Sequence, residues 1–169
     1  KSASVAKAST DDALLELALD VNGNDVTVPG IGTLLEKAGV CTKEDFYAAL
    51  GEVSLDSKLL SNVNSARAYC PLEGYLFPET YDFYVGDSEE CASLAIKRMI
   101  EETEKRITDD MYQRAAEMGY TMNEILTMAS IVQMESGQNA TEMPNVAAVF
   151  YNRLNSSAFS TLGSSPTYY

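Results

Sequence analysis

Histidine is absent from this chain of 169 residues, and its absence excludes several kinds of active site. Triads with a histidine base, histidine-assisted acid/base chemistry and most zinc sites all need that side chain. Carboxylates must therefore carry any acid/base chemistry, and we expect neither a metal ion nor another cofactor.

Basic residues are also few, because 12 lysines and arginines stand against 25 aspartates and glutamates, which gives a formal net charge of -13. Surfaces that bind nucleic acid or anionic headgroups neutralise phosphates with lysine and arginine. We therefore expect no nucleic-acid partner. The cysteines Cys41, Cys70 and Cys91 lack the CxxC spacing of redox and zinc sites. We interpret them as small buried hydrophobic residues, with one disulfide and a free thiol as the alternative.

Long apolar runs are missing too. None approaches the about 20 residues that cross a bilayer, and no signal peptide opens the chain. The abrupt ends at Lys1 and Tyr169 suggest a part of a longer protein, so we expect targeting segments to lie outside it.

Hydrophobic residues make up 46% of the chain, enough for one domain with a small lobe attached. We expect an α+β fold in which a helix-rich domain with short strands, residues 56–169, follows a small α/β lobe, residues 11–55. Residues 1–10 are small and polar and predict a linker or disordered end. Within the lobe we expect a helix over residues 11–19, a strand over 26–28, a helix over 34–38 and another helix capped by Thr42.

Within the larger domain, residues 72–84 place five aromatics around a glycine and a proline and predict strand and loop. Apolar residues at helical spacing then predict a helix from Asp87 to Ile107 and another that ends at Gly119. A capping box of Thr121 and Glu124 begins the next helix, to about residue 136, and a last helix follows Thr141.

Glu135 extends an apolar stripe on the helix of residues 122–136, because Ile131 and Val132 lie four and three residues before it. Partial desolvation there favours a neutral carboxyl group, as a general acid needs. The structural alternative is a solvated helix end, or a carboxylate that caps a neighbouring backbone.

Two further groups of polar residues lie beside aromatic residues. Glu73 and Glu79 lie beside aromatic residues in the sequence, a pattern that suits the binding of a sugar ring as well as a packed strand and turn. Asn152 and Arg153 follow two aromatic residues in the last helix, where an arginine can bind a carboxylate in a cleft or form a surface salt bridge.

Three segments in order, LEGYLFPETY at 72–81, ASIVQMES at 129–136 and VAAVFYNRL at 146–154, resemble the endolytic murein transglycosylase (MltG, YceG-like) family. Residues 26–50 look like the small LysM-like lobe of that family. The resemblance carries the catalytic glutamate over to Glu135, whereas position 133 holds glutamine in place of the common glutamate. The loop 162–167 has Ser165 where many members have aspartate before the Pro-Thr pair. Members continue into a segment that helps to form the cleft, so we expect the catalytic domain to continue beyond Tyr169.

The resemblance implies a lytic transglycosylase that cleaves the bond between N-acetylmuramic acid and N-acetylglucosamine in peptidoglycan strands and leaves 1,6-anhydro ends. It also implies action in cell-wall synthesis and cell division on the outer side of the bacterial membrane, through a single membrane anchor, with cell-wall synthases as possible partners. Besides Glu135, the expected substrate-binding residues are Glu73, Tyr75, Phe77, Ser136, Asn152 and Arg153.

Two alternatives belong to other classes. One is a non-catalytic peptidoglycan-binding or cell-division scaffold module, in which the carboxylates are structural. The other is a conventional glycoside hydrolase, which needs a second carboxylate, with Glu73 or Glu79 as the candidate.

Overall fold

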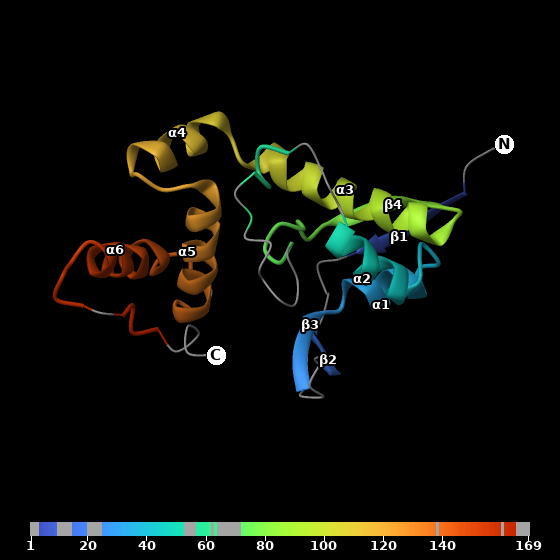
Figure 1. Ribbon diagram of the computed structural model, residues 1–169, viewed down its shortest axis with the longest axis horizontal. Coiled ribbons are helices and arrows are strands. Elements are labelled where there is room, and N and C mark those ends of the chain that lie inside the picture. The colour runs from blue at the N-terminus through green and yellow to red at the C-terminus, as the bar shows by residue number, and fades with distance from the viewer. Residues whose placement is uncertain are drawn as a thin grey trace. The chain divides into compact units, whose positions relative to one another are not determined.

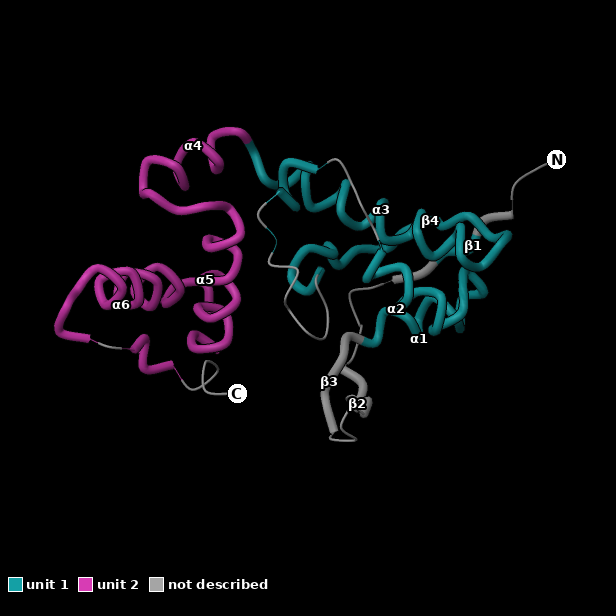
Figure 2. The backbone as a smooth tube through the Cα atoms, in the orientation of Figure 1, with its two compact units in different colours: residues 1–108 teal, residues 109–169 magenta. Residues whose placement is uncertain are grey.

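The computed structural model describes residues 4–9, 15–19, 25–52, 57–61, 63, 72–137, 139–159 and 161–164. These residues form a helix-rich α+β fold, which confirms the predicted class (Figure 1). The elements in order are β1 (Ser4–Ser9), β2 (Leu15–Leu19), β3 (Asp25–Pro29), α1 (Ile31–Lys37), α2 (Lys43–Glu52), β4 (Thr80–Val85), α3 (Ser88–Arg106), α4 (Asp109–Glu117), α5 (Met122–Glu135) and α6 (Met143–Leu154). They divide into two compact units, residues 1–108 and 109–169 (Figure 2).

The first two strands correct two predictions. Residues 1–10, predicted to be a linker, contain β1, which pairs antiparallel with β4 in a register that places Ser4 opposite Val85. Residues 11–19, predicted to be a helix, contain β2, which pairs antiparallel with β3 and places Leu15 opposite Pro29. Pairing with a partner strand gives both segments backbone hydrogen bonds that their own sequences do not specify.

The helices of the first unit agree with the local sequence signals. Thr42 accepts a hydrogen bond from the backbone of Asp45 at 3.1 Å, as an N-cap residue does for α2. The Asp45 carboxylate in turn accepts hydrogen bonds from the hydroxyls of Ser88 and Thr42, and these bonds lower its pKa. Asp87 caps α3 by accepting from the backbone of Glu90.

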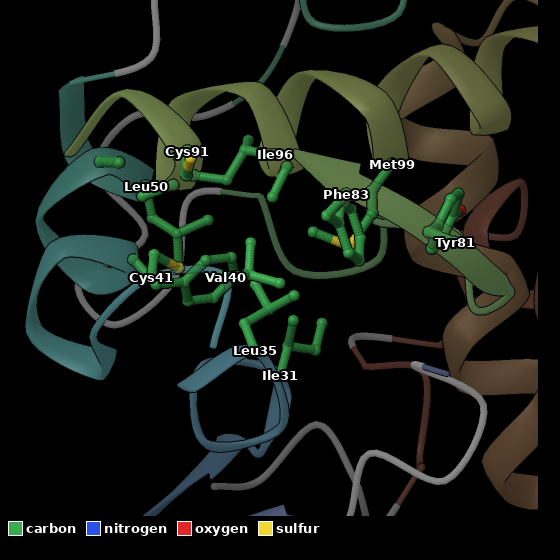
Figure 3. Packing of buried hydrophobic residues seen from close by; sticks show 14 of the residues in the cluster. Ile31, Leu35, Val40, Cys41, Leu50, Tyr81, Phe83, Cys91, Ile96 and Met99 are labelled. Atoms are coloured by element: carbon green, nitrogen blue, oxygen red, sulfur yellow. The ribbon is translucent and has the colours of Figure 1, made fainter. Parts of the chain in front are cut away.

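One hydrophobic core holds the first unit together (Figure 3). It joins Leu35 of α1 and Phe46 of α2 to Phe83 of β4 and to Ile96 and Met99 of α3, all of them almost completely buried. The helices of residues 31–52 therefore share a core with β4 and α3. The compact units accordingly divide after Thr108, whereas the predicted boundary lay near residue 55.

The second unit consists of α4, α5 and α6 and the chain that follows them. Its buried cluster contains Met128 and Val132 of α5 and Phe150 of α6. Across the described part of the chain, helices of the length and hydropathy that a membrane crossing needs are not found.

The cysteines agree with the interpretation as buried residues where the structure describes them. Cys41 and Cys91 are buried free thiols, and burial raises the pKa of Cys41 to about 11. Cys70 lies outside the described residues.

Candidate functional site

Glu135 occupies the last position of α5, and the helix that carries it is fixed at both ends. The predicted capping box is present, because the Thr121 hydroxyl accepts from the backbone of Glu124 and the Glu124 carboxylate accepts from the backbone of Thr121. The hydrogen bonds that the Glu124 carboxylate accepts from the backbone and the hydroxyl of Thr121 lower the pKa of Glu124. Gly137, with φ of 57°, takes the left-handed conformation that commonly ends a helix.

The Glu135 side chain is exposed, which corrects the expectation of partial desolvation. Met128 and Val132 form the buried line of α5, and the next step of four along that line reaches Ser136, where the helix has ended. Glu135 therefore lies at the margin of the apolar stripe. Its Oε1 atom accepts a hydrogen bond of 2.6 Å from the hydroxyl of Ser164, a residue with no exposed surface.

Arg153 holds the chain segment that contains Ser164. Its Nη1 atom donates to the backbone oxygen of Leu162, and its guanidinium carbon lies 5.9 Å from the ring centre of Phe150 and 5.5 Å from that of Phe159. Gly163 has φ of 66°, and a Cβ atom there would lie 3.0 Å from the same Nη1 atom. The guanidinium thus occupies the space that a side chain at position 163 would need.

Two other predicted site residues lie on the same unit. Asn152 is exposed on α6. The half-buried Ser136 caps the end of α5, where its hydroxyl donates to the backbone oxygen of Gln133 at 3.3 Å. The second unit therefore carries Glu135, Ser136, Asn152 and Arg153, and the first unit carries the other predicted site residues.

In the first unit, Glu73 lies at the tip of a tight turn. The backbone of Tyr75 donates to the oxygen of Leu72 at 3.0 Å, and Gly74 has φ of 85°. A turn of this kind leaves the Glu73 side chain exposed. Tyr75 points into the core instead, and its side chain is 1% exposed, so its ring offers no face to a ligand in this structure.

Phe77 is half-buried, and Arg106 of α3 covers one face of its ring, with the guanidinium carbon 3.9 Å from the ring centre. Arg106 also forms an ion pair of 3.3 Å with Glu79. The Tyr81 hydroxyl donates to the backbone oxygen of Phe77 at 2.7 Å. The segment 77–81 is thus held against α3 by the ion pair and the ring contact of Arg106.

A groove of about 490 Å³ lies along β4 and α3, where Asp82, Tyr84, Lys97 and Arg98 are among its lining residues. It contains none of the predicted site residues. Among the residues that the structure describes, no three cysteine, aspartate or glutamate side chains gather closely enough to bind a metal ion.

Comparison with known proteins identifies the family. The sequence model of the YceG-like family matches residues 5–169. The chain belongs to the YceG-like family. This match confirms the resemblance that three motifs predicted, and it includes residues 5–9 of β1.

Curated relatives of this chain carry a name that describes an activity. The endolytic murein transglycosylase of Bacillus subtilis (strain 168) is 38% identical over 85 residues, 50% of this chain and 22% of the relative. The endolytic murein transglycosylase of Streptococcus pneumoniae serotype 2 (strain D39 / NCTC 7466) is 39% identical over 93 residues, 55% of this chain and 16% of the relative. The matches thus span about a fifth of the relatives' length. No solved structure matches this YceG-like chain.

Ser164 was not predicted as a site residue, although its hydroxyl contacts Glu135 directly. The run from Ser160 to Ser165 is too common in composition to indicate a role by itself. The one sequence feature that could have indicated Ser164 is its place, with Gly163, just before the Ser-Pro-Thr of the loop 162–167. Arg153 was predicted to bind substrate, and here its Nη1 atom donates to a backbone oxygen.

Proposed function

We propose that this chain is the catalytic part of an endolytic lytic transglycosylase of peptidoglycan, with Glu135 as its acid and base. The observation that carries the proposal is the placement of Glu135: an exposed carboxyl group on the last residue of a capped helix, with one oxygen bonded to a buried serine. The other carboxylate of α5, Glu124, is held in the capping box. The helix therefore presents one carboxyl group for chemistry.

A single carboxyl group suits a reaction in which the substrate supplies the nucleophile. Glu135 gives its proton to the oxygen that links N-acetylmuramic acid to N-acetylglucosamine, and the bond from that oxygen to C1 breaks. The 6-hydroxyl oxygen of the same muramic acid bonds to C1, and its proton goes to the Glu135 carboxylate. The products are a free hydroxyl on N-acetylglucosamine and a 1,6-anhydro end, and no water is consumed. An ordinary glycosidase needs a second carboxylate for this work.

The remaining predicted residues take roles that follow from their surroundings. Glu73 and Asn152 are exposed and are proposed to contact glycan directly. Phe77, with one face against Arg106, is proposed to present its other face to a sugar ring. Ser136 is proposed to line the cleft next to Glu135, and Tyr75 to support the turn that bears Glu73. Replacing Glu73 by glutamine or Asn152 by alanine should raise KM more than it lowers kcat.

At the level of the whole protein, we place this activity on the outer side of the bacterial cytoplasmic membrane, in cell-wall synthesis and division. The first unit is proposed to contain a LysM-like lobe that binds glycan, and cell-wall synthases are proposed partners. The curated names of the relatives from Bacillus subtilis and Streptococcus pneumoniae support peptidoglycan as the substrate.

The test is a digestion of purified glycan strands by the full-length protein in water labelled with heavy oxygen. We expect unlabelled anhydro ends, and we expect Glu135→Gln to lower the rate by at least about 100-fold, because general acid catalysis contributes on that order. Glu124→Gln, the same substitution on the same helix, should keep most of the activity. Labelled reducing ends would indicate a hydrolase, and strands left intact by the wild-type protein would indicate a scaffold module.

A further inference from the structure

Ser164 differs from an ordinary surface serine, because it is completely buried and bonds to a group that is otherwise exposed. Its Oγ atom lies 2.6 Å from Oε1 of Glu135. A hydroxyl that donates to a carboxylate makes a stronger bond than one that donates to a neutral acceptor. The burial of Ser164 therefore fixes the position of a donor for one particular oxygen of Glu135.

The segment that carries Ser164 is itself fixed from α6. Arg153 donates to the backbone oxygen of Leu162, and its guanidinium lies against the position where Gly163 lacks a side chain. The same guanidinium is near the ring of Phe150, which belongs to the buried cluster between α5 and α6. A chain of contacts thus runs from the core of the second unit through Arg153 and the 162–164 backbone to Glu135.

We infer that Ser164 is a positioning residue for Glu135 and that Arg153 acts through it. A glutamate at the end of a helix has several staggered side-chain rotamers, and a proton can be transferred only from a conformer in which the carboxyl group reaches the glycosidic oxygen. The Ser164 hydroxyl holds Oε1 and leaves Oε2 as the atom that exchanges the proton with the substrate. This inference rests on the proposed function, since it assigns a geometry to the residue that the proposal makes catalytic.

In this role Arg153 supports the segment that carries Ser164. The alternative is that Arg153 binds a carboxylate of the substrate. The two roles predict different kinetics. An arginine that binds substrate raises KM when it is removed, whereas an arginine that holds the positioning segment lowers kcat. The two roles are therefore distinguishable with one variant.

The experiment measures kcat and KM for glycan-strand cleavage by the full-length protein and five variants, one of which is a control. Ser164→Ala should lower kcat by roughly 10- to 100-fold, because loss of alignment of a catalytic group costs on that order, and should leave KM within about twofold. Ser164→Thr keeps the hydroxyl and should restore most of the rate. Arg153→Met should also lower kcat. The double variant of Arg153→Met and Ser164→Ala should have a kcat only slightly lower than that of Arg153→Met alone.

Ser130→Ala is the matched control, because Ser130 is an exposed serine of the same α5 whose hydroxyl donates to the backbone of Thr127. Circular dichroism spectra must agree among all variants, and a Ser164→Ala protein that does not fold is replaced by Ser164→Cys, which keeps the size of the side chain with a weaker donor. An unchanged kcat in folded Ser164→Ala overturns the positioning role alone. Strands left intact by the wild-type protein overturn the proposed function, and the positioning role with it.

Discussion

The hydroxyl of Thr103 should matter more to stability than its methyl group, and Thr103→Val tests this. Thr103 is 6% exposed in the last turn of α3, and its Oγ1 atom donates to the backbone oxygen of Tyr75 at 2.6 Å. Valine keeps the methyl group and removes the donor. It also places a carbon atom against that oxygen, at a distance shorter than a carbon–oxygen contact allows.

The size of the loss follows from these contacts. A hydrogen bond contributes about 0.5–1.5 kcal/mol net, and a buried acceptor that loses its donor costs about 1–3 kcal/mol. We therefore expect Thr103→Val to lower the free energy of unfolding by about 2 kcal/mol. Thr103→Ser keeps the donor and removes one methyl group, so it should cost about 0.8 kcal/mol.

Urea unfolding followed by far-UV circular dichroism measures the loss, and hydrogen exchange of α3 peptides assigns it to the first unit. Thr127→Val is the control, because the Thr127 hydroxyl donates to Asn123 within its own helix, and a bond of that kind adds little to stability. The reasoning is refuted if Thr103→Val proves as stable as Thr103→Ser, since the methyl group would then outweigh the hydrogen bond.

Three further predictions concern conformation, pH and thiol chemistry. Gly74→Ala should lower the free energy of unfolding by about 1–2 kcal/mol, because φ of 85° strains any residue with a Cβ atom. Gly51→Ala in the helix α2 is the control and should be neutral or stabilising in the same urea titration. The Glu124 carboxylate, whose pKa its bonds with Thr121 lower from 4.5, should stabilise the protein above that pH and lose this effect as the pH falls through the lowered pKa. Thermal melts at several pH values should therefore find the difference between wild type and Glu124→Gln shrinking toward acid pH. Cys41, buried and with a pKa of about 11, should resist alkylation at pH 8 in the folded protein and react in urea, as mass spectrometry of its peptide would record.

Local signals predicted the helices of the second unit well. Thr121 and Glu124 specify the beginning of α5 through bonds that form within one turn, and Gly137 specifies its end. Motifs that combine residue type with spacing also led to Glu135 and to the family. These features depend on residues that lie close together in the sequence, so they can be predicted from the sequence alone.

Features that depend on distant residues were missed. The segment SVAKAS of β1 is small and polar, and it becomes a strand because β4 provides the other half of its hydrogen bonds. The LELAL of β2 fits a helix or a strand equally, and pairing with β3 decides between them. Ser164 was missed for the same reason, because its role depends on a hydrogen bond to Glu135, which lies on another segment of the chain.

The pairing of β1 with β4 also affects how the chain folds during its synthesis. Residues 4–9 leave the ribosome before residues 80–85, to which the register joins them, so β1 has no partner until most of the first unit has been made. The closure of so long a loop is entropically costly, and pairings of high sequence separation are slow to form. We therefore expect the helices α1 and α2 to form early and the sheet of β1 and β4 to complete the unit last. Removing residues 1–10 as though they were a linker would leave β4 without that strand.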